Sequence, residues 1–194
     1  MTTDAHSTHE LLERIELSWQ AFRPLVDKLT PDQVAAPRSD GRTVLEALAA
    51  VAFWNETCTP VFAWMRDQPD VPAPEWYGGD DLAIAAGAPW PRDDVHHARE
   101  AAWARAVPVA RVLARLDDAH AAAVAVIGTL TPAELARGEG LGGPGDATGI
   151  PADHPWQAMT RAERLIAKAT GCTYRLYDEL RPEIERILAT TPAS

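Results

Sequence analysis

Hydrophobic residues in this chain recur at every third or fourth position, which is the spacing of one face of an α-helix. The pattern is clearest between positions 7 and 29. Its apolar residues are Leu12, Ile15, Trp19, Phe22, Val26 and Leu29. Alanine is frequent, and valine, isoleucine and aromatic residues never form the short alternating runs that strands require. The sequence therefore predicts an all-α protein.

Four long amphipathic segments are expected as helices, over residues 7–29, 42–67, 93–129 and 156–189. Pro24 lies inside the first and predicts a kink in its last turns. A long crossover, 68–92, rich in proline and tryptophan, joins the second helix to the third, and a glycine-rich stretch, 137–155, precedes the fourth. We therefore expect one four-helix-bundle domain over residues 1–194.

The same turn motif follows the first and third predicted helices. Thr30-Pro31 and Thr131-Pro132 each read as an N-cap with proline at the first helical position. Gln33 and Glu134 stand three residues after the threonines and complete two capping boxes. The recurrence suggests two related helix pairs, although such caps are common and chance similarity explains it equally well.

Charge and composition narrow the function classes. The 28 acidic and 18 basic residues give a net charge of −10, which opposes binding to nucleic acid phosphates or an anionic membrane. No apolar run approaches the about 20 residues that span a bilayer, and the N-terminus lacks the features of a signal peptide. Cys58 and Cys172 are too few for a disulfide framework. We expect a cytoplasmic protein, monomeric or homodimeric.

Two segments carry a family resemblance. The first is GRTVLEALAAVAFWNE (41–56), an amphipathic helix that ends in tryptophan and a polar residue, and the second is ATGCTYRLYDEL (169–180). Both resemble DinB-like and ClbS/DfsB-like four-helix bundles, and residues 110–135 resemble the third helix and turn of that family. The resemblance covers most of the chain and implies a DinB-like bundle.

The resemblance also implies where a metal would bind. In metal-binding members, one histidine of the second helix and two of the fourth, four residues apart, converge on a divalent ion. The corresponding positions here are Ala50, Leu176 and Leu180, none of which offers a donor atom. We therefore expect no metal and no cofactor, and predict an apolar pocket between the second and fourth helices.

Residues around these positions are the candidates for ligand binding and chemistry. Glu56 and Tyr177 are the candidate acid or base groups, because each lies within about two turns of the altered positions. Both cysteines are expected to be buried small hydrophobes, since no cation stands beside them in sequence. The candidate ligand-binding residues are Trp19, Ala50, Trp54, Thr57, Cys172, Thr173, Leu176 and Leu180.

The histidines give a weaker signal for function. His96 and His97 point about 100° apart on a helix and cannot easily face one ion, so a solvated or capping role is expected. His120, with Asp117 on the same helical face, reads as a surface pair.

Three functions remain open. The leading hypothesis is a metal-independent hydrolase or isomerase that acts on a reactive, apolar or polycyclic secondary metabolite, in biosynthesis or self-resistance, as the resemblance to ClbS-like proteins implies. The second is a non-catalytic protein that sequesters such a compound. The third is a mycothiol-type thiol-dependent transferase or isomerase, whose metal dependence fits this sequence poorly.

Overall fold

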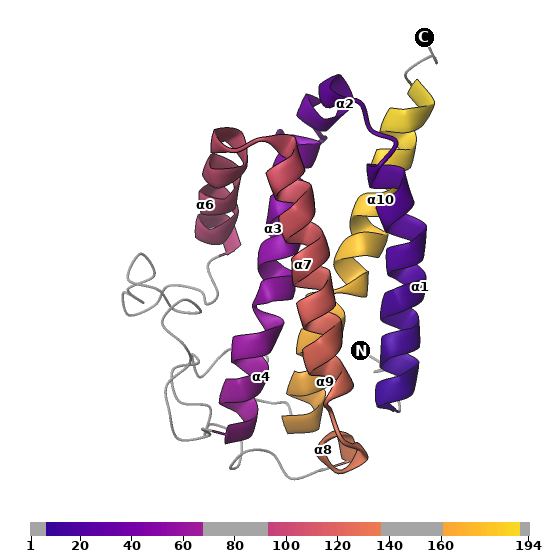
Figure 1. Ribbon diagram of the computed structural model, residues 1–194, viewed down its shortest axis with the longest axis vertical. Coiled ribbons are helices and arrows are strands. Elements are labelled where there is room, and N and C mark those ends of the chain that lie inside the picture. Colours follow the sequence, from indigo (N-terminus) through magenta and orange to yellow (C-terminus); the bar gives the residue numbers. More distant parts are fainter. Residues whose placement is uncertain (1–6, 68–92, 137–160, 191–194) are drawn as a thin grey trace.

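The computed structural model describes residues 7–67, 93–136 and 161–190, and this part of the chain is helical (Figure 1). The helices are α1 (Thr8–Val26), α2 (Pro31–Ala35), α3 (Val44–Glu56), α4 (Cys58–Asp67), α6 (Asp93–Ala106), α7 (Val109–Gly128), α8 (Pro132–Ala136), α9 (Arg161–Gly171) and α10 (Tyr174–Thr190). Within the described ranges the β-structure consists of one isolated bridge, between Pro37 and Thr43. The all-α prediction is confirmed.

Four rods run side by side along the long axis of the molecule (Figure 1). They are α1, α3 continued by α4, α7, and α9 continued by α10. α3 packs against α7 and α6, while α1 packs against α10 and α7. This arrangement is a helical bundle, as predicted, with α6 beside α3. The crossover 68–92 and the stretch 137–155 lie outside the described residues.

Three of the four predicted helices are interrupted, which the sequence analysis did not foresee. Between α3 and α4, Pro60 lacks the N–H that would bond the carbonyl of Glu56 in a continuous helix. Pro108 is the extended N-cap of α7 and separates it from α6. Between α9 and α10, the Thr173 hydroxyl donates to the carbonyl of Ala169 at 2.5 Å, while its backbone N–H bonds Thr170 instead.

Both predicted capping boxes are present. The Thr30 hydroxyl accepts from the backbone N–H of Gln33, whose side chain accepts from the Thr30 N–H. Thr131 and Glu134 make the same reciprocal pair at the start of α8. The first helix runs through Pro24 but ends at Val26 rather than at residue 29. Each box begins a short helix that turns the chain at an end of the bundle (Figure 1).

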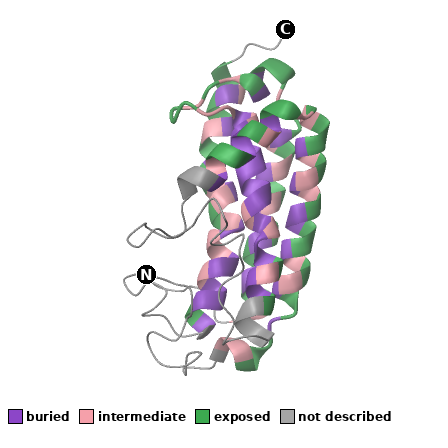
Figure 2. Ribbon diagram, turned by 90° about the vertical axis from the view of Figure 1, so that its left-hand side faces the viewer, coloured by how far each residue is buried: buried purple, intermediate pink, exposed green. Residues whose placement is uncertain are grey.

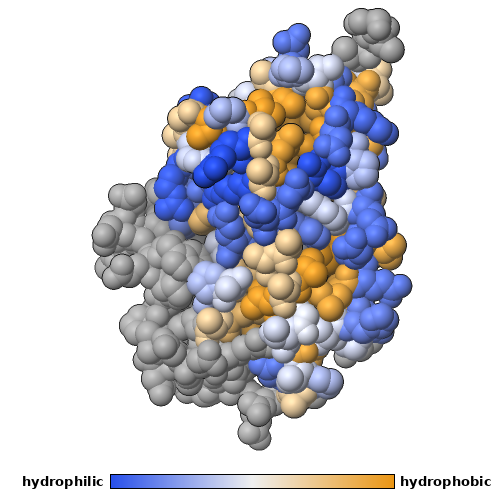
Figure 3. All heavy atoms as spheres, viewed as in Figure 1, coloured by the Kyte–Doolittle hydropathy of each residue, from blue (hydrophilic) through white to orange (hydrophobic). Residues whose placement is uncertain are grey.

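The hydrophobic core runs along the axis of the bundle (Figure 2). In α1 the buried stripe includes Leu11, whereas the predicted Leu12 and Trp19 are only partly buried. The largest side chains of the core come from every rod and include Ile15, Phe22, Leu48, Phe62, Leu116, Leu165, Tyr177 and Ile184. On the face in Figure 3, hydrophilic residues cover much of the surface, with hydrophobic residues visible between them. No described helix combines the length and apolar character needed to cross a membrane.

Candidate functional site

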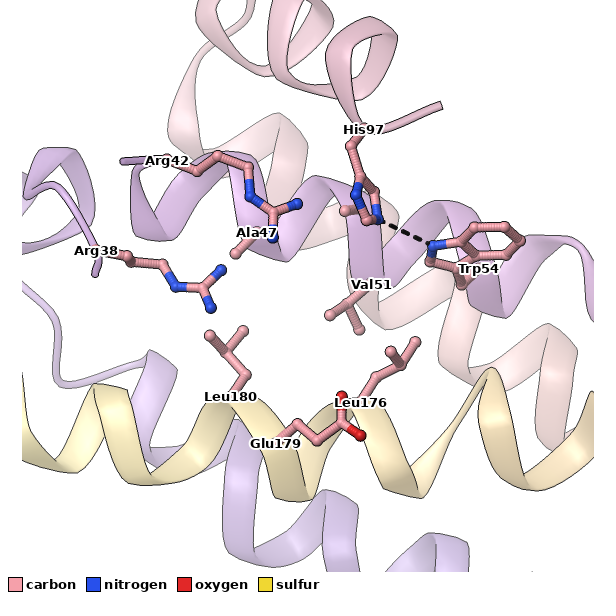
Figure 4. Close-up of a pocket in the computed structure, with 10 residues that line it drawn as sticks. Arg38, Arg42, Ala47, Val51, Trp54, His97, Leu176, Glu179 and Leu180 are labelled. Atoms are coloured by element: carbon pink, nitrogen blue, oxygen red, sulfur yellow. Dashed lines mark hydrogen bonds between the residues drawn. The ribbon is translucent and has the colours of Figure 1, made fainter. Parts of the chain in front are cut away.

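A cavity of about 160 Å³ lies between α3 and α10 (Figure 4). It is bounded by both helices, by the loop before α3 and by the first turns of α6. The lining residues are Arg38, Arg42, Ala47, Ala50, Val51, Trp54, His97, Leu176, Glu179 and Leu180. Four of the predicted ligand-binding residues, Ala50, Trp54, Leu176 and Leu180, therefore lie around one cavity.

Helical periodicity places the apolar walls. On α3 the lining residues stand at spacings of three and four, from Ala47 through Ala50 and Val51 to Trp54. On α10 the lining residues Leu176, Glu179 and Leu180 follow the same rule. Small side chains on α3 leave space opposite the leucines of α10. The result is an aliphatic cleft with the Trp54 ring at one end (Figure 4).

A tight turn before α3 supplies the polar end of the cavity. The N–H of Gly41 donates to the carbonyl of Arg38 at 3.0 Å, and the N–H of Arg38 donates to the carbonyl of Arg42 at 2.7 Å. Gly41 has φ of 81°, a left-handed conformation that glycine adopts without steric cost. The turn brings Arg38 and Arg42 together, and both guanidinium groups point toward the cavity (Figure 4).

Carboxylates hold each guanidinium in place. Glu183 accepts from Arg38 Nε at 2.7 Å and from the Ser39 N–H at 3.1 Å. Asp40 accepts from Arg42 Nε at 2.9 Å and from its Nη2 at 2.6 Å. Burial acts to raise the pKa of both carboxyl groups, but the arginine and backbone hydrogen bonds outweigh it and lower each pKa. Both acids are therefore ionised at neutral pH.

Two further polar side chains reach the cavity. His97 Nε2 accepts a hydrogen bond from the indole N–H of Trp54 at 3.3 Å, which fixes the ring over the apolar wall (Figure 4). Glu179 comes from α10 and forms a 3.9 Å ion pair with Arg175. A solvated or capping role was expected for His96 and His97. His96 is buried against Phe53, with ring centroids 4.8 Å apart, so solvation is wrong for His96, whereas His97 is partly exposed.

The donor set of the cavity does not fit the metal that the family implies. The three corresponding positions, Ala50, Leu176 and Leu180, all line the cavity with aliphatic side chains. In the described ranges no group of three histidine, cysteine or acidic side chains is placed to hold a metal ion. The side chains at these three positions therefore could not hold a divalent ion.

A buried polar network lies behind the cavity wall. The Tyr177 hydroxyl donates to Asn55 Oδ1 and accepts from His120 Nδ1 at 3.0 Å. Asn55 Nδ2 donates to the carbonyls of Val51 at 3.0 Å and Cys172 at 2.7 Å. Burial raises the pKa of Tyr177 well above its ordinary value. Tyr177 is therefore a neutral hydrogen-bonded group of the core and does not line the cavity.

His120 is buried, contrary to the expected surface pair with Asp117. Its ring stacks on Trp19 with centroids 3.9 Å apart and an interplanar angle of 6°. Burial lowers the pKa of His120 to about 4, against smaller opposing effects from Glu16 and Asp117. The imidazole is therefore neutral at pH 7, and Trp19 packs on it rather than lining the cavity.

Lys168 lies near both cysteines, which the sequence analysis did not foresee. Lys168 is buried, and its ammonium donates to Thr57 Oγ1 at 2.6 Å and lies 5.3 Å from the Trp54 ring centroid. A hydrogen bond from the Cys58 thiol, opposed by burial and aided by Lys168, lowers the pKa of Cys172. Cys172 is therefore a buried thiol, as predicted, whose pKa its neighbours lower.

The remaining candidates lie elsewhere. Glu56 accepts from Arg115 Nε and Nη2, both at 2.7 Å, and does not line the cavity. Thr57, Cys172 and Thr173 are buried and are not among the residues that line the cavity. Val51 and Ala47 were missed, although their helical spacing from Ala50 and Trp54 could have identified them. Arg38 had no comparable signal, because its partner Glu183 is distant in sequence, and the pairing of Arg42 with Asp40 is local and does not indicate a cavity.

Fold and site together define a class of protein, helical bundles with a cavity between their second and last rods. Residues 14–169 match the family model described as the DinB superfamily, and the chain therefore belongs to that superfamily. No curated protein and no solved structure gives a significant match to the chain.

Proposed function

We propose that this protein binds a small organic molecule in the cavity between α3 and α10, without a metal ion. The observation that carries the proposal is the cavity itself, which opens where aliphatic side chains replace the ligands of metal-binding relatives. Apolar walls with a few convergent polar groups are the usual composition of a small-molecule site.

The cavity volume sets the size of the ligand. A dry apolar cavity of about 150 Å³ engineered in another protein binds benzene. The cavity here, about 160 Å³, therefore suits a molecule with the bulk of one ring or one branched aliphatic group. A polycyclic metabolite would have to extend beyond the walls formed by Val51, Trp54 and Leu176.

Binding to the cavity is tested with toluene as the probe, detected by ligand-observed NMR in buffer that contains EDTA. Ala50→Trp fills the cavity at a possible cost of about 1–3 kcal/mol in stability. Toluene should bind the parent and Ala122→Trp, an exposed position on α7, but not folded Ala50→Trp. Equal binding to all three proteins, or binding that EDTA abolishes, would contradict the proposal.

Hydrolysis is the second candidate function, because His97 and Glu179 both reach the cavity. Either group could act as general base for a bound ester or reactive metabolite, as a resistance hydrolase would require. Glu56 and Tyr177, the acid–base candidates from sequence, are engaged in an ion pair and a buried hydrogen bond instead.

Turnover of p-nitrophenyl acetate separates an enzyme from a sequestering protein. If the site is catalytic, Glu179→Gln or His97→Gln should reduce hydrolysis by about 10²-fold or more, while Glu56→Gln leaves it unchanged. Hydrolysis no faster than that of Ala50→Trp would leave ligand binding as the function.

A further inference from the structure

We infer that the occupant of the cavity is an organic monocarboxylate, with its carboxylate on Arg38 and Arg42 and its apolar body between Val51, Trp54 and Leu176. This inference rests on the proposed function, because it assigns the chemical class of the ligand to the same cavity.

Within the described part of the chain, Arg38 and Arg42 keep N–H donors that no other residue accepts from. A guanidinium carries five N–H donors in a rigid fork. Arg42 gives its Nε and one Nη2 bond to Asp40, and within the described residues no bond from its Nη1 is found. Arg38 gives Nε to Glu183 and places Nη1 3.5 Å from Asp40. Both guanidinium groups thus retain N–H groups toward the cavity (Figure 4).

The two carboxylates that pair with the arginines do not themselves line the cavity. Asp40 and Glu183 bind the other edges of the guanidinium groups. They fix the orientation of both forks before a ligand arrives, which lowers the entropic cost of binding. A ligand that enters between α3 and α10 therefore meets positively charged N–H donors rather than their counterions.

Glu179 is the acidic group that lines the cavity, and exposure weakens its influence. Its side chain is 66% exposed and pairs with Arg175, whereas the side chains of Arg38 and Arg42 are 15% and 33% exposed. Charges in a less exposed position interact more strongly, because water screens them less. The balance inside the cavity favours an anionic group over a cationic one.

The carboxylates near the cavity oppose a second negative charge on the ligand. Asp40 and Glu183 pair with the arginines, Glu179 lines the same cavity, and the chain carries a net charge of −10. A phosphate dianion would gain the same N–H bonds but add a second charge among three acids. A carboxylate forms the paired hydrogen bonds of a guanidinium with one negative charge.

The aliphatic half of the cavity determines the other end of the ligand. Leu176 and Leu180 face Ala47 and Val51 across the space between the helices (Figure 4), and Ala50 lines the same cavity. An apolar part of the ligand placed between these side chains buries no polar atom without a hydrogen-bond partner. The ligand class is therefore a carboxylate attached to one ring or to a branched chain.

Benzoate, benzamide, benzylamine and toluene form a matched probe set with nearly constant size. In titrations followed by NMR, benzoate should bind the parent about tenfold more tightly than benzamide, as expected for charge-assisted hydrogen bonds. Arg42→Gln should remove that preference and leave toluene binding unchanged. Arg181→Gln, on α10 outside the cavity lining, is the control and should behave as the parent.

Glu179→Gln provides a second, independent test in case the Arg42→Gln variant does not fold. It should leave benzoate binding equal or tighter. A preference for benzylamine, or equal affinity for benzoate and benzamide, would overturn the carboxylate assignment while toluene binding still supports the cavity. Failure of all four probes to bind the parent would instead overturn the proposed function.

Discussion

At the scale of single residues, Tyr177 shows how burial changes a predicted role. Its hydroxyl joins Asn55 on α3 to His120 on α7, and its side chain is fully buried. A hydroxyl with two protein partners and a raised pKa suits a structural group better than a proton donor to a ligand. Because Asn55 also bonds the carbonyl of Cys172, the network joins α3, α7 and the break before α10.

Replacing Tyr177 with phenylalanine is expected to act on stability. The change leaves Asn55 Oδ1 and the His120 ring N–H buried without their partner, at a cost of about 1–3 kcal/mol. Urea unfolding followed by circular dichroism measures this cost. Tyr174→Phe is the control, because Tyr174 is partly exposed and packs under Arg14, and it should change stability by less than about 0.5 kcal/mol. Equal effects would contradict the structural role.

At the scale of elements, the turn that carries Arg38 and Arg42 is held by its own hydrogen bonds and by a residue that is distant in sequence. Its backbone hydrogen bonds and the φ of Gly41 shape it, and Glu183 on α10 ties it to the bundle. The arginines therefore sit on a constrained turn rather than on a free loop. This constraint supports their role as a preorganised pair.

Gly41→Ala should destabilise the protein through backbone conformation alone. No atom lies within 4 Å of an added Cβ, so the cost is that of a left-handed conformation, about 1–2 kcal/mol. Gly171→Ala is the matched change: its Cβ also meets no atom within 4 Å, but its backbone is helical. That variant should be neutral or stabilised by up to about 1 kcal/mol. Thermal or urea unfolding that ranks the two in reverse would refute the argument.

At the scale of the whole molecule, acidic and buried titratable groups make stability depend on pH. Asp40, Glu46 and Glu183 have lowered pKa values because their hydrogen bonds to arginine and backbone outweigh burial. Their contribution is present above the ordinary carboxyl pKa and is lost as pH falls through the lowered values. His120 acts at higher pH, because burial holds its imidazole neutral.

Stability should fall by about 1–2 kcal/mol between pH 7 and pH 5, because of His120. Its pKa is about 4 in the folded chain and about 6.5 when unfolded, so protonation favours unfolding across this interval. Asp40, Glu46 and Glu183 have lowered pKa values and contribute little to the loss between pH 7 and pH 5. Urea unfolding at both pH values should show the loss in the parent and in His9→Gln, an exposed position, but less in His120→Gln. A parallel loss in all three proteins would assign the effect to other groups.

The sequence alone predicted the features that depend on near neighbours in the chain. Helical periodicity predicted the all-α bundle, and both capping boxes followed from a threonine and an acid or amide three residues later. The family resemblance implied Ala50, Leu176 and Leu180 as the altered ligand positions, and helical spacing from Ala50 added Trp54. Pro60 and Pro108 also carried a local signal for two of the helix breaks.

Tertiary structure decided what depends on distant partners and on burial. Arg38 meets Glu183, Lys168 meets Thr57, and each pair is more than a hundred positions apart in the chain. Helix packing creates these contacts, and burial sets the direction of the pKa shifts of His120 and Tyr177. The helical pattern and the family resemblance therefore pointed to the apolar wall of the site, whereas only packing brought the arginine pair to that wall and placed Tyr177 and Glu56 outside the cavity.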